Sequence, residues 1–273
     1  MTRSRPGFRM IHTFLRRINH SPIWKRKVRV RGASFLPPTL DRWLALQAHR
    51  CGLMGADDIQ YLKRFVRPDW RIGDIGANQG VYTLFFSSLA RLGYVYAFEP
   101  DPCLFASLEE NVRRNGANNV RLFEAAAARH ATRLSLQPGL FNRGDNQILR
   151  AGRSSTGTID VEAISLDEAI PEQRLDLLKI DVQGYEVEVL KGAQRILEIN
   201  PHLLIYIEFW PHGLRKAGSD PEEMLDILHK AGFSLSRHVK ALEYEPFTYR
   251  TNEWTRTTQF CNLIAGKASA GEE

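Results

Sequence analysis

The chain has 273 residues, of which 43% are hydrophobic and 25% are charged, proportions typical of a soluble globular protein. We expect neither a transmembrane helix nor a secretory signal peptide, because no run of eighteen apolar residues occurs and no apolar segment stands near the N-terminus. The three cysteines are far apart and lack the spacing of metal ligands, which predicts reduced thiols and a cytoplasmic protein.

The net charge of +6 is unevenly distributed along the chain. The first forty residues hold ten Lys or Arg and no acid, so the remainder carries a net charge of −4. This asymmetry divides the chain into a basic N-terminal extension (1–50), a main domain (51–268) and a loose tail (269–273).

Several apolar residues of the extension would share one face of a helix among arginines: Phe8, Ile11, Leu15 and Ile18. Such a helix suits weak contact with a membrane surface through residues 1–31, and it also suits a solvated arm that packs a few apolar residues on the domain. Stacking aromatic residues are sparse in this segment, so we expect no nucleic-acid partner.

Strand and helix patterns alternate through the main domain. Apolar runs predict strands at 27–31, 70–75, 94–98, 120–124, 132–137, 158–164, 175–181, 203–208, 233–239 and 258–265. Helical periodicity predicts helices at 41–50, 56–66, 80–93, 101–116, 185–199 and 221–232, with a short helix from residue 165 and a long polar loop at 138–157. The alternation predicts an α/β fold with a doubly wound, mostly parallel sheet.

Residues typical of helix ends support several of these boundaries. Asp101 and Pro102 have the types preferred at the N-cap and first position of a helix, and Ser165 with Glu168 forms a capping-box pattern. Gly93 is a candidate C-terminal stop for the helix that begins near Gly80.

The strand–turn–helix segment at residues 70–100 predicts a site for a nucleoside cofactor. Glycines stand at Gly73, Gly76 and Gly80, a spacing that differs from the G-x-G-x-x-G fingerprint of dinucleotide sites. Asp74, inside this run, would repel a pyrophosphate and suits a cationic ligand with an amino group, such as S-adenosylmethionine. Glu99, which closes the next strand, is placed to bind two ribose hydroxyls.

Acids also end the other predicted central strands. In a doubly wound sheet these positions meet at one edge, where ligands bind: Asp74, Glu99, Glu124, Asp181 and Glu208.

The sequence resembles the FkbM family of S-adenosylmethionine-dependent methyltransferases. The matching stretches are DIGANQGVYTL (74–84), FEPDPCLFASLEENVRRN (98–115), ISLDEAI (164–170), LLKIDVQGYEVEVLKGA (177–193) and LIYIE (204–208). The resemblance implies a class I methyltransferase with a Rossmann-like fold, and methylation of a hydroxyl on a sugar or secondary metabolite, so that the partner is a small-molecule or glycan acceptor. Gln183 departs from the family, which commonly has Glu there, and this puts a role for an acid at that position in doubt.

The resemblance also implies roles for individual residues. Gly76, Ala77, Asn78 and Gly80 should surround the methionine part of S-adenosylmethionine, and Asp74 should lie beside its amino group. The full expected cofactor-binding set is Asp74, Gly76, Ala77, Asn78, Gly80, Glu99, Pro100, Glu124, Ala125 and Asp181.

Two residues are candidates for the chemistry. Asp181 should lie near the transferable methyl group, where it could bind the cofactor amine, orient the acceptor, act as a base or ligate a metal; the alternative is a cap on the following helix. His212, after the aromatic pair Phe209–Trp210, could deprotonate an acceptor hydroxyl or be a solvated loop residue. The carboxylates permit a metal site, but no spacing demands one, so none is assigned.

Two other classes of protein remain as alternatives. One is a non-catalytic protein of the same fold that binds a nucleoside cofactor, and the other is a nicotinamide-dependent oxidoreductase, which the glycine spacing disfavours.

Overall fold

The computed structural model describes residues 28–30, 33–35, 56–139, 145–149, 156–240 and 243–267. The expected amphipathic face of the extension, the expected helix 41–50, the tail 269–273 and most of the expected loop 138–157 lie outside these residues. Membrane contact and the division of the chain into extension, domain and tail therefore stay predictions. Within the described part of the chain, no helix has both the length and the apolar character needed to cross a membrane.

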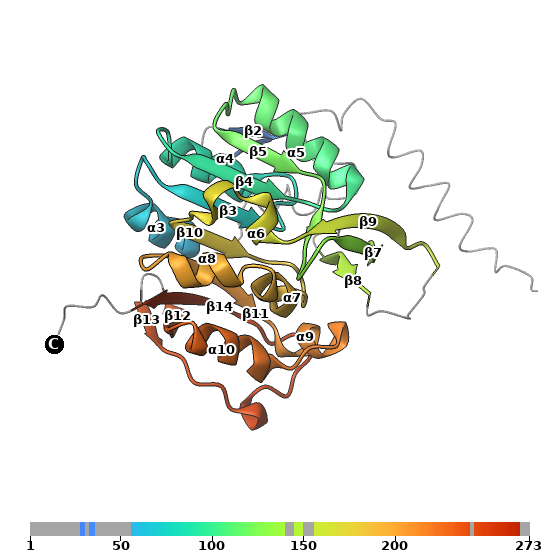
Figure 1. Ribbon diagram of the computed structural model, residues 1–273, viewed down its shortest axis with the longest axis vertical. Coiled ribbons are helices and arrows are strands. Elements are labelled where there is room, and N and C mark those ends of the chain that lie inside the picture. The colour runs from blue at the N-terminus through green and yellow to red at the C-terminus, as the bar shows by residue number, and fades with distance from the viewer. Residues whose placement is uncertain are drawn as a thin grey trace, which may run out of the picture.

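An eight-stranded sheet forms the centre of the molecule (Figure 1). Its order is β13-β12-β14-β11-β10-β3-β4-β5, and the five strands from β11 to β5 are parallel. Its members are β3 (Arg71–Ile75), β4 (Tyr94–Phe98), β5 (Val120–Phe123), β10 (Leu177–Ile180), β11 (Leu204–Phe209), β12 (Phe233–Lys240), β13 (Glu243–Pro246) and β14 (Cys261–Lys267). This arrangement confirms the predicted doubly wound, mostly parallel sheet.

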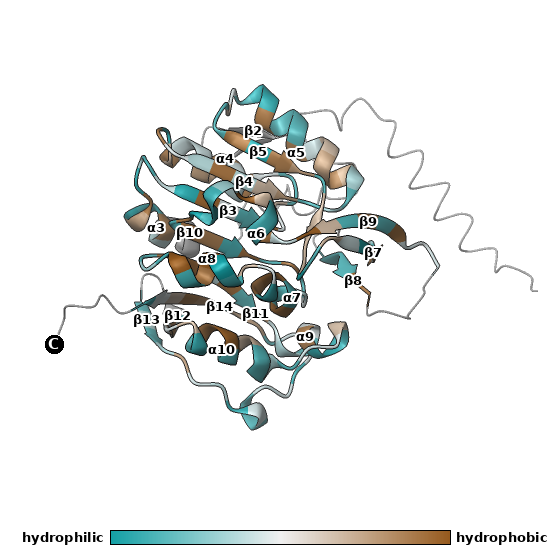
Figure 2. Ribbon diagram, in the orientation of Figure 1, coloured by the Kyte–Doolittle hydropathy of each residue, from teal (hydrophilic) through white to brown (hydrophobic). Residues whose placement is uncertain are grey.

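Helices cover both faces of this sheet. They are α3 (Ala56–Phe65), α4 (Val81–Leu89), α5 (Pro102–Arg114), α6 (Leu166–Ala169), α7 (Glu186–Lys191), α8 (Gln194–Ile199), α9 (Pro211–Ala217) and α10 (Pro221–Lys230), with 3₁₀ turns at Pro171–Gln173 and Thr251–Glu253. Leu62 of α3 and Phe86 of α4 pack with Ile72 on one face, whereas α6, α7, α8 and α10 pack around Ile75 on the other. Figure 2 shows the resulting apolar strands between helices with polar outer surfaces.

The residue pattern of β10 follows from this two-sided cover. All four of its residues are buried, so the strand is a continuous apolar run with one exception, Lys179. A strand covered on both faces needs no alternation of polar and apolar residues, which is why a lysine in this position calls for a specific partner.

A second, four-stranded sheet lies beside the main one and was not predicted as a separate unit (Figure 1). It has the order β6-β9-β7-β8 and consists of β6 (Ala126–Ala127), β7 (Thr132–Gln137), β8 (Gln147–Ile148) and β9 (Ile159–Ile164). The predicted 138–157 loop therefore contains a short strand, β8, which pairs with β7. A further antiparallel pair joins β1 (Val28–Val30) to β2 (Ala33–Phe35).

Two predicted helix starts are confirmed by their capping bonds. The Asp101 carboxylate accepts from the backbone N–H of Cys103 and Leu104, and Pro102 is the first residue of α5. Ser165 Oγ accepts from the Glu168 N–H at 3.2 Å and donates to the Glu168 carboxylate at 2.9 Å.

Three expectations about helices are wrong. The helix predicted at 185–199 is two helices, because the chain breaks at Gly192 and Ala193. Gly93 does not end α4, whose last residue is Leu89; a Cβ on Gly93 would lie 1.9 Å from the Trp70 carbonyl oxygen, so close backbone approach explains this glycine. The aromatic loop expected at Phe209–His212 is instead the end of β11 and the start of α9.

The break at Gly192 generates a prediction about stability. A Cβ there would lie 1.9 Å from the carbonyl oxygen of Ala128, the residue directly after β6, and a backbone oxygen cannot rotate away as a side chain could. We expect Gly192→Ala to lower the free energy of unfolding by about 1–3 kcal/mol, measured by urea unfolding. Gly266→Ala is the matched control, since a Cβ there meets nothing within 4 Å; an equal loss in both variants would contradict the close-approach explanation.

Candidate functional site

The carboxyl ends of the parallel strands bring the predicted acids to one edge of the sheet. Asp74 is the fourth residue of β3, Glu99 follows β4, and Glu124 follows β5. Asp181 follows β10, and Glu208 is the fifth residue of β11. The acids differ in exposure: Asp74 and Glu99 are buried, Asp181 and Glu208 are partly buried, and Glu124 is exposed.

A buried ion pair lies beneath the glycine turn. The parallel register sets Lys179 opposite Asp74, and Lys179 Nζ lies 3.2 Å from Asp74 Oδ1. Thr83 Oγ1 donates to the other carboxylate oxygen of Asp74 at 2.6 Å. Burial opposes the charged amine, but the carboxylates of Asp74 and Asp181 outweigh it, so the pKa of Lys179 is raised and the amine is charged.

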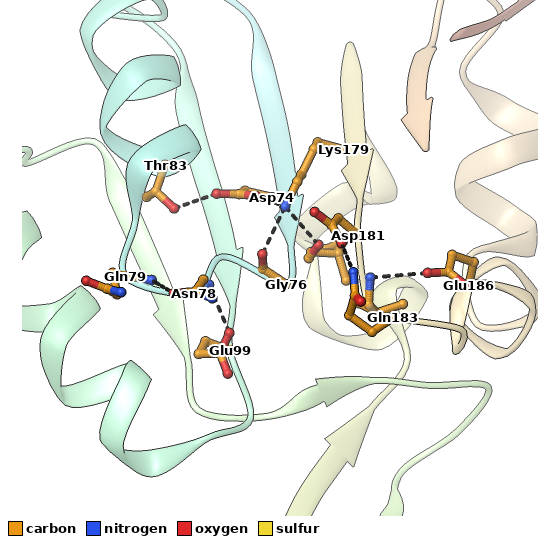
Figure 3. A network of polar contacts seen from close by, with 12 residues as sticks. Asp74, Gly76, Asn78, Gln79, Thr83, Glu99, Lys179, Asp181, Gln183 and Glu186 are labelled. Carbon is orange, nitrogen blue, oxygen red and sulfur yellow. Dashed lines mark hydrogen bonds and ion pairs between the residues drawn. The ribbon is translucent and has the colours of Figure 1, made fainter. Parts of the chain in front are cut away.

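The same amine holds the turn that follows β3. Lys179 Nζ donates to the Gly76 carbonyl oxygen at 2.9 Å, and Figure 3 shows the lysine between Asp74 and Gly76. Asp74 is thus fully buried, with a cation on one oxygen and a hydroxyl on the other. The expected contact of Asp74 with a cofactor amine stays a prediction, and the structure adds a partner that the sequence reasoning missed. The signal in the sequence that could have indicated this partner was a lysine in an otherwise apolar strand.

The turn from Gly76 to Gly80 contains several left-handed residues. Gly76, Asn78 and Gly80 have φ of 77°, 53° and 90°. The N–H groups of Gly76 and Ala77 both donate to the Phe98 carbonyl oxygen, at 3.1 and 2.9 Å, which ties the turn to the end of β4.

Internal packing accounts for the two glycines of this turn. A Cβ on Gly76 would lie 1.9 Å from the Asp181 carbonyl oxygen, and one on Gly80 would lie 2.6 Å from the Leu108 side chain. The spaces that a side chain would fill are therefore filled by protein. Contact of these two glycines with a ligand would have to use their backbone groups, and it stays a prediction.

Glu99 organises the other side of the turn. Its Oε2 accepts from the Asn78 N–H and its Oε1 from the Asp101 N–H, each at 2.9 Å. Burial raises the pKa of Glu99 to about 7 despite these two bonds. A carboxylate offers about four acceptor positions, so two bonds leave capacity for hydroxyls of a ligand.

A third group of residues lies where β10 and β11 end. Gln183 Nε2 donates to Asp181 Oδ1 at 2.9 Å and to Glu208 Oε2 at 3.0 Å. Burial and the nearby Asp181 carboxylate raise the pKa of Glu208. The N-cap residue of α7 is Tyr185, and no side chain caps this helix. The alternative role of Asp181 as a helix cap is therefore wrong.

Glu186 stabilises the turn that carries Gln183. Its Oε1 accepts from the N–H groups of Val182 and Gly184, at 3.3 and 3.1 Å. Burial raises the pKa of this fully buried carboxyl to about 7, in spite of its backbone bonds.

The remaining predicted residues surround this edge. Pro100 is partly buried and Ala125 is buried, on the chain that follows β4 and β5 respectively. His212 is exposed near the start of α9, with its ring centroid 5.9 Å from that of Trp210. The next residue, Gly213, packs against the 181–184 turn, because a Cβ on Gly184 would lie 2.5 Å from its carbonyl oxygen. In the described ranges, no three His, Cys, Asp or Glu side chains are grouped so that they could hold a metal ion.

Comparisons with known proteins converge on one family. The methyltransferase FkbM domain family matches residues 74–235. The hexuronic acid methyltransferase AglP of Haloferax volcanii is 28% identical over 182 residues, which are 65% of this chain and 69% of that protein. The 2-O-methyltransferase NoeI of Sinorhizobium fredii is 28% identical over 189 residues, which are 62% of this chain and 75% of that protein.

One solved structure matches part of this chain. The crystal structure of methyltransferase FkbM from Methylobacillus flagellatus matches 73% of this chain at 16% identity with a TM-score of 0.47. This chain covers 44% of that longer chain.

The buried ion pair yields a prediction that needs no ligand. Lys179→Met leaves the Asp74 carboxylate buried without its cation, and we expect the free energy of unfolding to fall by about 3–5 kcal/mol. The double variant Lys179→Met, Asp74→Asn removes both charges and should recover part of that loss. Chemical denaturation of wild type, Lys179→Met, Asp74→Asn and the double variant measures the coupling.

Lys230→Met serves as the control for this cycle. Lys230 is an exposed lysine 3.6 Å from Asp226, so its loss should change stability by no more than about 0.5 kcal/mol. Independent, additive effects of the two changes at positions 74 and 179 would show that the pair does not act as a unit.

Proposed function

This chain belongs to the FkbM methyltransferase family, and we propose that it transfers a methyl group from S-adenosylmethionine to a hydroxyl oxygen of a sugar or secondary metabolite. It is a methyltransferase, and its sheet, with the antiparallel β14 inserted between β11 and β12, is the Rossmann-like class I methyltransferase fold.

The excess of acids at the carboxyl edge of the sheet is the observation that supports this cofactor. Glu99, Asp181, Glu186 and Glu208 lie at this edge, and the buried cation that faces them, Lys179, is already ion-paired with Asp74. Such an edge attracts a ligand that carries a sulfonium and an ammonium group and repels a pyrophosphate. The same argument disfavours a nicotinamide dinucleotide.

The residues present fit the two ends of S-adenosylmethionine. Glu99, a buried carboxylate with spare acceptor capacity, would hold the ribose hydroxyls. Asp181 would hold the amino group or face the reacting atoms, since its backbone lies against the Gly76 turn. Glu124 and Ala125 are proposed for the adenine side.

S-adenosylmethionine supplies an electrophilic methyl group, so the chain must mainly orient the acceptor oxygen in line with it. Such orientation is worth roughly 7–11 kcal/mol of the barrier. In such a transfer the oxygen–methyl bond would form as the sulfur–methyl bond breaks, S-adenosylhomocysteine would leave with the bonding electron pair, and the acceptor hydroxyl would lose its proton to a base of the chain. Asp181, held by Gln183 beside Glu208, is the group we propose for this step, and the exposed His212 is the alternative. General base catalysis contributes roughly 10²–10⁴-fold.

The acceptor class rests on the relatives. AglP is named for a hexuronic acid and NoeI for a 2-O position, which supports a carbohydrate or another hydroxyl-bearing metabolite as the acceptor of this chain. Weak membrane contact through residues 1–31 is a separate proposal, which rests on the ten basic residues among the first forty.

Two measurements test the proposed function. Calorimetric titration should show binding of S-adenosylmethionine or S-adenosylhomocysteine, and incubation with methyl-labelled S-adenosylmethionine and pooled cell metabolites should give a labelled product identifiable by mass. Tight binding of NAD without either sulfur ligand would favour the oxidoreductase. Binding without any transfer to the pool would favour the non-catalytic protein of the same fold.

The raised pKa of Glu99 predicts a pH-dependent affinity. Ribose hydroxyls donate to the ionised carboxylate, whose population rises as pH passes through about 7, so the ligand should bind more tightly at pH 8 than at pH 6. Because titration of the ligand's own amine affects every variant alike, the informative quantity is the ratio of Kd for Glu99→Gln to Kd for wild type. We expect this ratio for S-adenosylhomocysteine to rise up to about tenfold between pH 6 and pH 8. A ratio that does not change with pH would argue against contact between Glu99 and the ribose.

The role of Asp181 predicts a separation of turnover from binding. Asp181→Asn keeps the size of the side chain but removes its charge, so we expect kcat to fall by about 100-fold or more, while the Kd for S-adenosylhomocysteine changes much less. His212→Gln, assayed in parallel with the same metabolite pool, should keep most of its activity. The reverse outcome, with loss only in the His212 variant, would assign the base to His212.

A further inference from the structure

Gln183 occupies an unusual position between two acidic strand ends. It directly follows Val182 in the turn after β10, and its side chain reaches Glu208 on the neighbouring strand β11. A single atom, Nε2, makes both bonds, at 2.9 Å to Asp181 and 3.0 Å to Glu208. An amide nitrogen has two hydrogens, so each carboxylate receives one.

The backbone around Gln183 is held in place for this contact. Gln183 has φ of 53° and Gly184 has φ of 105°, so two successive residues are left-handed, and the first of them has a side chain. A left-handed non-glycine residue costs of order 1–3 kcal/mol and persists only where its surroundings fix it. Two contacts hold this turn in place. The Glu186 carboxylate accepts from the N–H groups of Val182 and Gly184, and Gly184 packs on Gly213.

Two carboxylates that converge within 3 Å of one atom repel each other unless something positive lies between them. A shared proton, a metal cation or a donor group with two hydrogens can each fill that position. Here the amide of Gln183 fills it. Figure 3 shows its bond to Asp181.

We propose that Gln183 is a positioning residue that fixes the Asp181 and Glu208 carboxylates through its two amide hydrogens, so that the pair can orient an acceptor hydroxyl and accept its proton without a bridging cation. The proposal rests on the proposed function for the chemical step, whereas the positioning itself rests on the two bonds and the left-handed turn.

Other charged and titratable groups also face this pair. These groups are Lys179 on β10, Glu186 on α7, Asp145 two residues before β8, Cys261 on β14 and, through Cys261, Arg237 on β12. All of them stay unchanged when position 183 alone is varied, so differences between variants report on the amide.

The test compares the thermal midpoints of wild type, Gln183→Glu and Gln183→Leu between pH 4.5 and pH 8, in buffer with EDTA. At the low-pH end the Glu208 carboxyl, whose pKa burial raises, is largely protonated and needs no donor, so Gln183→Glu should unfold nearer the wild-type temperature there than at pH 8. As the pH rises, the new carboxylate in Gln183→Glu lies beside the ionised carboxylates of Asp181 and Glu208 and is repelled by them. In Gln183→Leu the same two carboxylates lack the amide that donates to them. We expect both midpoints to fall relative to wild type with rising pH, by about 3 °C or more at pH 8.

Gln194→Glu is the control for the added charge, since Gln194 is exposed at the first position of α8. Because an acid at a helix N-terminus is neutral or mildly stabilising, its midpoint should not fall relative to wild type as the pH rises. A constant offset of the Gln183 variants across the whole pH range would show that Gln183 only packs the turn, and this would overturn the proposal.

A second readout connects the positioning to turnover. In the labelled-methyl assay with pooled metabolites as the acceptor probe, the acid limb of the rate in Gln183→Leu should move to higher pH by about one unit, with rates nearer wild type at high pH. An unshifted acid limb would overturn the catalytic part of the proposal. Because the thermal titration needs neither cofactor nor acceptor, absence of S-adenosylmethionine binding by wild type would refute the proposed function without obscuring the result for Gln183.

Discussion

A single buried ammonium group connects the parts of this structure on which the site depends. Lys179 Nζ joins the carboxylate of Asp74 on β3 to the carbonyl oxygen of Gly76 in the turn that follows. A charged amine without a partner would be costly at full burial, so the lysine and the aspartate require each other. Their register in neighbouring parallel strands fixes where the turn begins, and Thr83 on the following helix completes the shell around the carboxylate.

This ion pair also determines which acids remain for a ligand. Because Asp74 is neutralised from within, the uncompensated negative charge lies toward Glu99 on one side of the turn and toward Asp181 and Glu208 on the other. Burial raises the pKa of Glu99 to about 7, so this carboxyl can change its charge near neutral pH, and burial also raises the pKa of Glu208. The site therefore combines the buried, charge-balanced Asp74–Lys179 pair with the acidic side chains of Glu99, Asp181 and Glu208. This arrangement suits a cationic cofactor.

Helix and strand positions were predictable wherever the signal was local. The capping residues Asp101 and Ser165 placed two helix starts correctly, because N-cap bonds involve residues only two or three positions apart. The break between α7 and α8 was not predictable, because at this point Gly192 packs against the backbone of Ala128, a residue far away in the sequence that directly follows β6. Gly93 was misassigned for the same reason: a glycine needed for close packing and one that ends a helix look alike in a sequence.

The sequence by itself determined the alternation of strands and helices, the identity of the acids at the strand ends and the resemblance to a methyltransferase family. Each of these follows from periodicity, turn chemistry or motif spacing along the chain. Only the tertiary structure decided how those acids are partnered. It showed that Asp74 is neutralised by Lys179, that Glu99 holds the turn through Asn78, and that Gln183 joins Asp181 to Glu208. Hydrogen bonds and ion pairs between strands depend on register and burial, and these are fixed only when residues about twenty or a hundred positions apart pack together.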